Sequence, residues 1–278
     1  MKSKHTLPFL ETMITQVCNL SCKGCTNYSD LPHKGYVTWE SGKQDLENWL
    51  EILDIPDFGI MGGEPLINPQ WRRWVYGVRE LMPNSQIRFT TNGLLLRKYP
   101  DIIDEMFEVG NIIFKITAHT EDADEFIKKT ENDYNWDVVE EYGITRLKGK
   151  NNVRFQVNRP KVFIKTFKND YKNMLPFNNN PKDAFDCCIQ QTCPLLYKGR
   201  IFKCSTAGLL KDTLAFVGAD DTKWKKYIDK GIGINDEIEK INQFISNFGK
   251  PNYICSQCPT KKNNANIILH NLDTITKK

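Results

Sequence analysis

Cysteine residues give this chain its clearest potential for chemistry. Nine of the 278 residues are cysteines. Eight of the nine fall into three groups, and Cys204 stands alone. The first group is Cys18, Cys22 and Cys25, the second is Cys187, Cys188 and Cys193, and the third is Cys255 and Cys258. Disulfides are disfavoured in a reducing compartment, where clustered cysteines indicate metal binding or catalysis. The grouping therefore predicts metal centres rather than scattered core thiols.

The first group has the spacing C-x3-C-x2-C in the stretch "CNLSCKGC", which follows the apolar run "LETMITQV". A [4Fe–4S] cluster has four irons, and proteins normally supply four cysteine thiolates to it. Three thiolates leave one iron without a protein ligand. Because an open coordination position distinguishes a chemically active metal site from a sealed structural one, we expect a small molecule to bind there.

The composition is that of a globular chain, with 40% hydrophobic and 26% charged residues. The net charge of +4 is spread along the chain and is too small to indicate nucleic-acid binding. No apolar run approaches the roughly 18 residues that span a bilayer. The N-terminal segment is interrupted by Pro8, Glu11 and Thr12, unlike a signal peptide. We therefore expect a cytoplasmic protein with no nucleic-acid and no membrane partner.

Short β-rich segments alternate with helical patterns in the first part of the chain. In the stretch 38–53, Leu46, Trp49, Leu50 and Leu53 recur at helical spacing, and Thr38 is a candidate N-cap. Repeated strand–helix units favour parallel strands with right-handed connections. About six such units predict an α/β fold, a partial (β/α)6 TIM-like barrel with functional groups at the carboxyl ends of its strands. The expected strands are 10–15, 57–61, 86–91, 112–118, 153–158 and 161–167, and the expected helices are 38–53, 69–82 and 99–109.

The character of the sequence changes near residue 170, where the stretch "FKNDYKNMLPFNNNPKDAF" is rich in Asn, Lys and Pro. Such a composition is typical of a linker. The remaining six cysteines follow, with a predicted hairpin that turns at Lys198-Gly199 and a helical stretch at 235–248. We therefore expect a barrel core at residues 1–168. Residues 169–278 are expected to form a linker and a small Cys-rich extension made of a hairpin plus a helix.

Two further motifs accompany the first cysteine group. "GGEPL" at 62–66 follows the second expected strand, and "TTNG" at 90–93 ends the third. With C-x3-C-x2-C, and in this order, they make the chain resemble the radical S-adenosylmethionine (SAM) superfamily over roughly residues 10–167. The resemblance implies that Gly62, Gly63, Glu64 and Pro65 bind the methionine end of SAM, with Glu64 as the charge partner of its ammonium group.

The same resemblance implies roles for four other residues near the cofactor. Thr91 and Asn92 are expected near the ribose or the methionine of SAM. Tyr28 matches a position where an aromatic residue often lies near the adenine, although it could equally pack the loop. His119, at the end of the strand expected at 112–118, would contact SAM or the substrate, or else be structural.

The implied reaction begins when the amino and carboxylate groups of SAM bind the open iron of the cluster on Cys18, Cys22 and Cys25. An electron from the reduced cluster breaks the sulfonium bond to the 5′ carbon. The resulting 5′-deoxyadenosyl radical then abstracts a hydrogen atom from the substrate, while the protein positions the cofactor and excludes water. An external one-electron donor of the flavodoxin or ferredoxin type is the implied partner.

The C-terminal cysteines also match a family pattern. Ten residues separate Cys188 from Gly199, four separate Gly199 from Cys204, and a C-x2-C pair follows at Cys255 and Cys258. This part of the chain resembles the SPASM and twitch extensions of some radical SAM enzymes. The twitch form, with a single auxiliary cluster, is the better match because no cysteine follows Cys258. The resemblance implies an auxiliary [4Fe–4S] cluster held by these four cysteines.

Several alternatives stay open at this second site. Cys193 competes with Cys188 for the first ligand position, and Cys187 is a weaker competitor. Four protein thiolates would saturate the cluster and suit it to electron transfer, whereas three would leave an iron open to anchor the substrate. A structural zinc site also fits a C-x2-C pair with two distant cysteines.

An auxiliary cluster commonly accepts the electron left after hydrogen abstraction, which favours a net oxidation or a radical cross-link. The candidates are a small-molecule dehydrogenase, acting on an alcohol or aminocyclitol, and a peptide-modifying oxidase. Because the barrel is expected to begin near residue 10, we expect a small substrate or a peptide delivered by a separate partner. The cyclisation enzyme of molybdopterin synthesis matches less well, since the terminal "NLDTITKK" contains no Gly-Gly. The alternative function is a non-catalytic iron–sulfur or zinc protein, such as a redox carrier or an assembly module.

Overall fold

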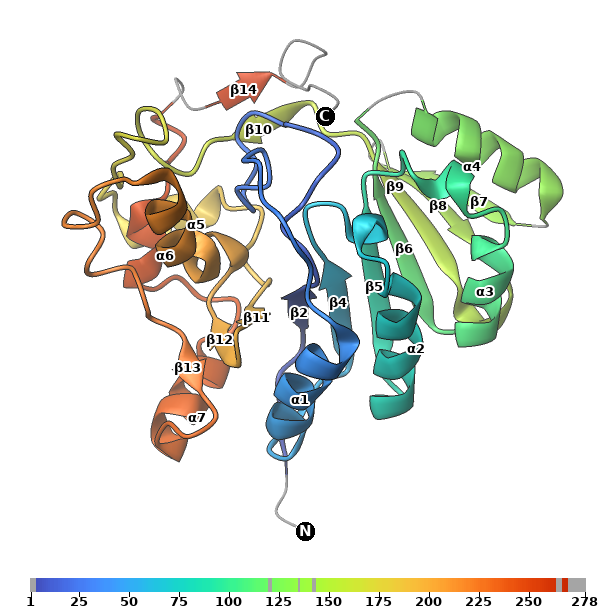
Figure 1. The fold of residues 1–278 in the computed structure, drawn as a ribbon, viewed down its shortest axis with the longest axis horizontal. Coiled ribbons are helices and arrows are strands. Elements are labelled where there is room, and N and C mark those ends of the chain that lie inside the picture. Colours follow the sequence, from blue (N-terminus) through green and yellow to red (C-terminus); the bar gives the residue numbers. More distant parts are fainter. Residues whose placement is uncertain (1–3, 120–121, 135, 142–143, 264–266, 270–278) are drawn as a thin grey trace.

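A ten-stranded β-sheet organises the protein, whose computed structural model describes residues 4–119, 122–134, 136–141, 144–263 and 267–269 (Figure 1). Its parallel part follows the order β11-β2-β4-β5-β6-β9. These strands span Leu195–Tyr197, Leu10–Met13, Asp57–Met61, Gln86–Thr91, Ile112–Thr117 and Arg154–Asn158. Their carboxyl ends share one edge, where parallel α/β folds hold their functional groups.

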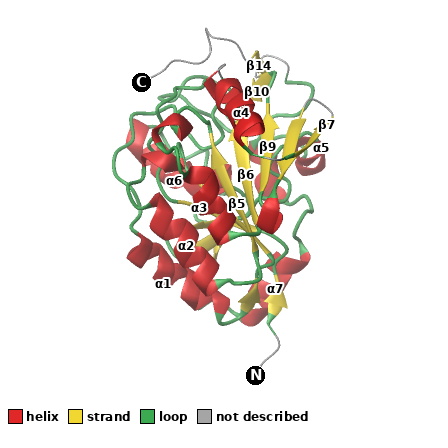
Figure 2. Cartoon of the chain, turned by 90° about the vertical axis from the view of Figure 1, so that its right-hand side faces the viewer, coloured by secondary structure: helices red, strands yellow, loops and turns green. Residues whose placement is uncertain are grey.

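Helices cover the outer face of the parallel strands (Figure 2). α1 (Trp39–Leu50), α2 (Trp71–Leu81) and α3 (Ile102–Val109) pack side by side on this face, and α4 (Asp122–Asp133) follows β6. The Thr38 hydroxyl accepts a hydrogen bond from the backbone N–H of Ser41 (3.3 Å), so Thr38 caps α1 as the sequence predicts. The predicted helices at 38–53, 69–82 and 99–109 are thus present.

Alternation along the strands separates an apolar face of the sheet from a polar one. Ile87 and Phe89 of β5 enter the core, as do Phe114 and Ile116 of β6. Because successive side chains of a strand point to opposite faces, the residues between them lie on the inner face. That face carries charged and hydroxyl side chains: Glu11, Arg88, Thr90, Lys115 and Thr117. The sheet therefore presents a polar floor beneath its carboxyl edge.

The strand predicted at 161–167 lies outside the main sheet. Its residues Val162–Ile164 form β10, which pairs antiparallel with β14 (Ile267–Leu269). Pro160 precedes β10 and has no backbone N–H for a sheet ladder, which disfavours a central strand here. β11 is the sixth parallel strand and pairs with β2. At the other edge, β8 (Ile144–Lys148) pairs antiparallel with β9, and β7 (Asp137–Glu141) pairs antiparallel with β8. The α/β class, a partial barrel with a Cys-rich C-terminal extension, is confirmed.

The C-terminal region adds its own hairpin to the edge of this sheet. β11 pairs with β12 (Arg200–Phe202), and the hairpin turns at Lys198-Gly199, whose φ angles are 50° and 73°. β12 also pairs with β13 (Ile232–Gly233), so this region continues the sheet of the barrel. The helices of the region are α5 (Pro181–Asp186), α6 (Ser205–Val217) and α7 (Ile238–Ser246). α7 lies inside the helical stretch predicted at 235–248, whereas the division into domains at residues 168 and 169 stays a prediction.

Short elements complete the part of the chain that the structure describes. β1 (His5–Thr6) pairs in parallel with β3 (Leu53–Asp54). Short 3-10 turns lie at Pro65–Ile67, Leu96–Lys98, Lys150–Asn152 and Tyr253–Gln257. Within the described residues, no helix has both the length and the apolar character needed to cross a membrane.

Candidate active site

A cavity of about 370 Å³ opens at the carboxyl edge of the parallel strands. The three motifs found in the sequence meet there, together with the end of β6. Their lining residues are Cys18, Cys22, Cys25, Gly62, Gly63, Thr90, Thr91 and Asn92, with His119 from the chain after β6. Segments that are far apart in the sequence therefore converge where such a fold places its chemistry.

The cysteine loop begins five residues after β2 ends. Gly24 has a φ of +81°, a left-handed conformation that favours glycine, and the Cys25 N–H donates to the Cys22 carbonyl (3.2 Å). The Leu20 N–H donates to the Cys18 sulfur (3.4 Å). Burial raises the pKa of Cys25. Metal binding requires the thiolate form, so these thiols would release protons when a metal centre forms.

Gly62 and Gly63 let the segment after β4 pack directly against the chain after β2. The Gly63 N–H donates to the Thr15 carbonyl (2.7 Å). A Cβ atom at Gly63 would lie 2.4 Å from the Val17 carbonyl oxygen, and one at Gly62 would lie 2.7 Å from the Thr15 carbonyl oxygen. Any other residue type would push the cysteine loop away from the cavity.

Glu64 is fully buried behind the cavity wall and does not line the cavity. Its carboxylate accepts hydrogen bonds from the Thr91 hydroxyl (2.7 Å) and from the backbone N–H groups of Asn92 (2.7 Å) and Leu66 (3.1 Å). Burial raises the pKa of Glu64 to about 7, and these hydrogen bonds oppose the rise. Pro65 is buried in the 3-10 turn beside it. Direct contact of these two residues with SAM stays a prediction, and the geometry gives Glu64 the role of holding the turn after β5.

Asn92 connects that turn to the cysteine loop. Its side-chain amide donates to Asn19 Oδ1 (2.7 Å) and lies 3.8 Å from the Cys18 sulfur. Its Oδ1 accepts from the backbone N–H of Leu94 (3.0 Å), which fixes the amide in place. The carboxylate of Glu64 is thereby linked to the first cysteine, and the three motifs form one hydrogen-bonded unit.

Tyr28 and His119 have different surroundings. Tyr28 is fully buried, its hydroxyl donates to the Thr206 carbonyl (3.4 Å), and its ring centroid lies 6.3 Å from that of Phe167. Tyr28 does not line the cavity, a placement that favours the loop-packing alternative. His119 lines the cavity, with its ring centroid 5.8 Å from that of Phe163. A contact between His119 and SAM or substrate stays a prediction.

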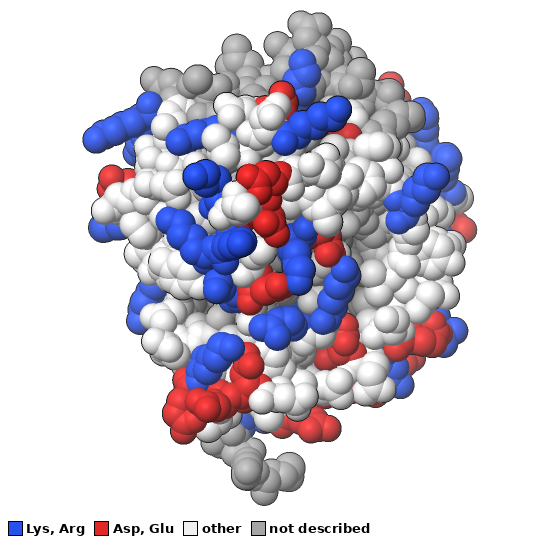
Figure 3. Space-filling view, turned by 60° about the vertical axis from the view of Figure 1, so that its left-hand side comes forward, with Lys and Arg blue, Asp and Glu red and all other residues white. Residues whose placement is uncertain are grey.

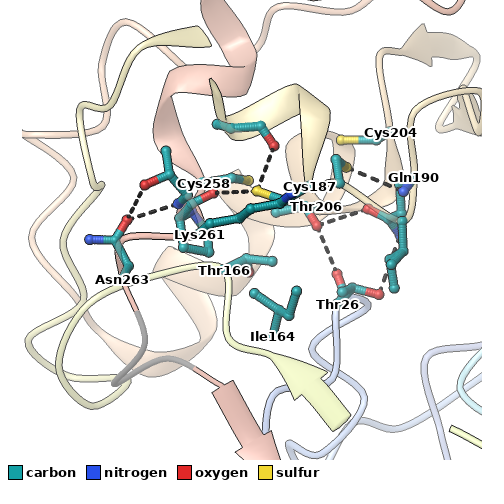
Figure 4. Close-up of a pocket in the computed structure, with 15 residues that line it drawn as sticks. Thr26, Ile164, Thr166, Cys187, Gln190, Cys204, Thr206, Cys258, Lys261 and Asn263 are labelled. Atoms are coloured by element: carbon teal, nitrogen blue, oxygen red, sulfur yellow. Dashed lines mark hydrogen bonds between the residues drawn. The ribbon is translucent and has the colours of Figure 1, made fainter. Parts of the chain in front are cut away.

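The four cysteines expected to hold an auxiliary cluster lie together in the C-terminal region. Cys188, Cys204, Cys255 and Cys258 line one small cavity of about 20 Å³. An adjoining cavity of about 120 Å³ shares three of them, all except Cys255, and is also lined by Cys187 (Figure 4). The structure thus brings together the four residues that the sequence pattern selects.

Local hydrogen bonds distinguish Cys188 from its neighbour Cys187. Burial raises the pKa of Cys188, and the Gln190 N–H, which donates to its sulfur (3.2 Å), opposes that rise. The Cys187 thiol instead donates to two carbonyls of α5, both at 3.4 Å. Cys204 is the N-cap of α6, where the helix dipole also favours a thiolate, although burial raises its pKa to about 12. Cys188 and Cys204 are therefore better suited to metal binding than Cys187.

Cys193 lies apart from the other C-terminal cysteines. It lines the first cavity and neither of the two C-terminal ones. Burial raises its pKa to about 12, and the charged residues that influence it most are Glu11 and Lys115 of the cavity floor. The geometry therefore does not group Cys193 with the four cysteines of the second site.

Gln190 connects the two cysteine sites (Figure 4). Its side-chain amide donates to the hydroxyls of Thr26 (3.3 Å) and Ser205 (2.5 Å), and its Oε1 accepts from the Thr206 hydroxyl (3.1 Å). Thr26 directly follows the last cysteine of the first loop, and Ser205 and Thr206 directly follow Cys204. A single side chain thus holds the two cysteine-bearing segments together.

The described thiols surround cavities and do not converge on one point. The ligands of a [4Fe–4S] cluster bind different irons and surround the cluster. A zinc ion instead needs its ligands within about 2.3 Å of one point. Within the described residues, no three His, Cys, Asp or Glu side chains converge to hold one ion. The thiols line cavities instead: the three of the first loop and Cys193 in the barrel, and four others in the C-terminal region.

Comparison with known proteins agrees with this geometry. The sequence model of the Radical SAM superfamily matches residues 12–151, a span that contains all three motifs. This chain belongs to the radical SAM superfamily. Membership implies a [4Fe–4S] cluster, SAM and a reductant, and the three-cysteine loop with its open cavity fits the first two.

Curated relatives match between a third and a half of the chain. A GTP 3′,8-cyclase of Clostridium acetobutylicum is 30% identical over 139 residues, which are 47% of this chain and 41% of the relative. A GTP 3′,8-cyclase of Alkaliphilus metalliredigens is 30% identical over 115 residues, which are 37% of this chain and 32% of the relative. The chain therefore matches less than half the length of these relatives.

One solved structure resembles nearly the whole chain of this radical SAM protein. The crystal structure of BtrN in complex with AdoMet and 2-DOIA has a TM-score of 0.50 and 13% identity, and the match covers 93% of this chain and 95% of that one. At such identity the likeness shows the fold alone. It extends the agreement in fold to the C-terminal region, beyond the residues that the superfamily model matches.

Sequence reasoning missed the charged residues on the floor of the first cavity. Glu11 of β2 and Lys115 of β6 line it, as does Thr117. A signal was present, because each charged residue interrupts an otherwise apolar strand segment, "LETM" and "IIFKIT". A charge at an inward position of such a strand indicates a polar site.

Proposed function

We propose that this radical SAM enzyme holds its [4Fe–4S] cluster on Cys18, Cys22 and Cys25 and binds SAM at the iron that lacks a protein ligand. The observation that carries the proposal is the buried carboxylate of Glu64. It fixes the turn after β5, and through Asn92 it reaches the cysteine loop. Such a network holds a site rigid before its ligand binds, as precise chemistry requires.

When bound, the cluster and SAM supply a 5′-deoxyadenosyl radical that abstracts hydrogen from a substrate C–H bond. The chain contributes placement and shielding. Gly62 and Gly63 line the cavity without side chains, which allows a ligand to approach their backbone closely. Thr91 and Asn92 are held at the rim, where their polar groups can orient the cofactor. A bound cofactor and substrate that fill this cavity would displace water from the place where the radical forms.

We propose that Cys188, Cys204, Cys255 and Cys258 hold an auxiliary [4Fe–4S] cluster in a twitch-like extension. Four thiols lining one cavity supply a full ligand set, which suits electron transfer better than substrate binding. Gln190 joins this site to the first cysteine loop. An electron acceptor tied to the reaction chamber favours a net oxidation or a radical cross-link, and hence an oxidoreductase.

The polar floor of the cavity favours a polar substrate, which is a small molecule or a peptide side chain. For the reductant we propose a flavodoxin- or ferredoxin-type carrier. Lys203, Lys230 and Lys240 line a surface cavity of about 270 Å³ beside α7, close to Tyr253 in the turn that carries Cys255. Figure 3 shows Lys and Arg side chains over much of this side of the molecule, with Asp and Glu side chains among them. Such a surface would attract an acidic carrier.

A cyclase reaction is the second candidate, because the curated relatives named above are GTP 3′,8-cyclases. Their similarity covers 47% and 37% of this chain, and 41% and 32% of the relatives. Because less than half of each relative is matched, the similarity supports the radical-forming step of the superfamily more than it supports GTP as substrate. Consumption of GTP by the reconstituted enzyme would favour the cyclase over an oxidation.

Anaerobic reconstitution tests the proposed function. Two clusters predict about eight iron atoms per chain. With SAM and dithionite, the wild type should form 5′-deoxyadenosine, and Cys22→Ala should abolish that product. Cys187→Ala removes a cysteine outside both proposed ligand sets and serves as the matched control, with product formation retained. A wild type that binds iron but forms no 5′-deoxyadenosine would instead support the non-catalytic iron–sulfur alternative. A content of about four irons and one zinc per chain would support a structural zinc site in place of the second cluster.

A further inference from the structure

Two opposite charges lie unpaired on the floor of the first cavity. Glu11 of β2 and Lys115 of β6 both line it, and Glu11 is only 9% exposed. Neither side chain forms a hydrogen bond or an ion pair with any residue that the structure describes. A buried charge without a partner is unfavourable, so natural proteins seldom keep one unless a ligand completes it.

The charged residues that the structure describes near Glu11 and Lys115 do not form ion pairs with them. Arg88 lies on the strand between them in the sheet, but its Nε donates to the Asp57 carboxylate (2.8 Å) and its guanidinium lies over the Phe9 ring (5.0 Å). The Glu11 carboxylate and the Lys115 ammonium influence each other, yet their charged atoms are more than 4.0 Å apart. The separation leaves a gap in which polar groups of a ligand fit.

Gly59 lies beside Glu11 in the sheet. Glu11 is paired in register with Gly59 of β4, and Gly59 is paired with Arg88 of β5. A Cβ atom at Gly59 would lie 2.8 Å from the Glu11 Cβ atom. The strand beside Glu11 therefore carries no side chain at that level, and the Phe9 ring, which would lie 3.0 Å from that Cβ atom, packs there and fixes the position of Glu11 at the cavity floor. Because both charges stand on strands of the central sheet, their separation is set by rigid elements.

The chemistry of the two groups indicates what they bind. Burial raises the pKa of Glu11 to about 8, while Lys115 and Arg88 oppose the rise. An ammonium group placed beside Glu11 would favour its ionised form. A carboxylate placed beside Lys115 would satisfy the second charge. A neutral polyol would leave both charges without an ionic partner.

We propose that Glu11 and Lys115 form a subsite for an α-amino acid, with Glu11 binding its ammonium group and Lys115 its carboxylate. A zwitterion gives the buried Glu11 and the half-buried Lys115 each an opposite partner and brings no net charge into the cavity. The inference rests on the proposed function, since it treats this cavity as the reaction chamber, and it names free amino acids as the substrate class.

The methionine end of SAM carries the same two groups and is the other possible source of this chemistry. It belongs at the cysteine loop, because its amino and carboxylate groups are the ligands proposed for the open iron. Glu11 precedes Cys18 by seven residues and lies within β2, below the strand end from which the loop departs. Saturation with SAM therefore separates the two sources.

The test is saturation-transfer NMR on reconstituted holoenzyme with saturating SAM and no reductant, using the twenty free L-amino acids as probes. At least one amino acid should bind. Its N-acetyl derivative and its decarboxylated amine should each bind about tenfold more weakly or worse, because each lacks one charged contact.

Two variants assign the contacts. Glu11→Gln should lose the preference for the free amine over the N-acetyl derivative, and Lys115→Met should lose the preference for the amino acid over its decarboxylated amine. A misfolded variant would lose binding of every probe and could not produce this crossed pattern. Glu51→Gln and Lys98→Met change exposed charges outside the cavity and should leave both preferences intact.

Three outcomes would overturn the inference: no amino acid binds, both variants keep both preferences, or the amino acid binds only when SAM is absent. The last outcome would assign the pair to the methionine end of SAM. Formation of 5′-deoxyadenosine by the same wild-type preparation, after dithionite is added, separates this inference from the proposed function. A preparation that cleaves SAM but binds no amino acid rejects only the amino-acid subsite.

Discussion

Glu64→Gln tests the network that joins the three motifs. The substitution keeps the size and shape of the side chain but replaces one carboxylate oxygen by an NH2 group. In the wild type, Oε2 accepts from the Asn92 N–H (2.7 Å), and Oε1 accepts from the Thr91 hydroxyl (2.7 Å) and the Leu66 N–H (3.1 Å). The Thr91 hydroxyl can rotate to accept a hydrogen bond, but a backbone N–H cannot.

The size of the effect follows from counting donors. Whichever way the amide of the variant turns, its NH2 group faces the N–H of Asn92 or of Leu66, and one buried donor loses its acceptor. An unsatisfied buried donor costs about 1–3 kcal/mol. If the lost hydrogen bond destabilises the SAM-binding conformation by this free energy, the affinity for SAM falls by roughly 5- to 150-fold.

Equilibrium binding of SAM to reconstituted, unreduced protein measures this effect, with the rate of 5′-deoxyadenosine formation as a second readout. Glu40→Gln is the control, because Glu40 is exposed on α1 and pairs with Arg73. Its affinity for SAM should match that of the wild type. Wild-type affinity in Glu64→Gln, at full iron content, would refute the claim that this carboxylate holds the SAM site together.

Three further predictions concern the second site, the bridge and pH. Cys188→Ser should lower the iron content from about eight to about four atoms per chain, whereas Cys187→Ser should leave the iron content unchanged. The reverse pattern would show that Cys187, and not Cys188, is the cluster ligand. Gln190→Ala removes three hydrogen bonds and should lower the thermal midpoint by roughly 3–9 °C relative to the exposed control Gln44→Ala, with both clusters retained. An unchanged midpoint would show that the bridge adds no stability. Burial raises the pKa of Glu64 from its ordinary value of 4.5 to about 7, so its protonation stabilises the fold at low pH, and that stabilisation is lost as the pH rises through 7. Between pH 5 and pH 8 the wild type should therefore lose about 2.5 kcal/mol of unfolding free energy relative to Glu64→Gln, and a pH-independent difference would contradict the raised pKa.

The sequence predicts the barrel well because each of its elements has a local signature. β5 alternates in "QIRFTT", α1 has a capped amphipathic pattern, and the structure contains both. The position of β11 has no such signature. Its residues "LLY" show a short apolar strand, but only tertiary packing decides that the strand pairs in parallel with β2, more than 180 residues earlier in the chain. The strand predicted at 161–167 fails for the same reason, since its own pattern does not reveal its partner β14.

The candidate site divides in the same way. Close spacing identifies the three-cysteine loop, and the resemblance to a family pattern selects four cysteines of the C-terminal region, which the structure brings together around one cavity. Spacing cannot place Cys193, which lies five residues after Cys188 and yet lines the other cavity. It also cannot show that Glu64 turns away from the cavity toward Thr91 and Asn92. These orientations depend on contacts between distant segments.

The central claim is that three cysteines leave one iron free for SAM. Electron–nuclear double resonance tests it most directly, on a Cys188→Ser/Cys204→Ser variant that retains the first cysteine loop. The reduced cluster is mixed with SAM labelled with 15N in its amino group. We predict a hyperfine coupling from the label to the cluster, absent with unlabelled SAM. A reduced [4Fe–4S] cluster with no such coupling at saturating SAM would contradict the claim.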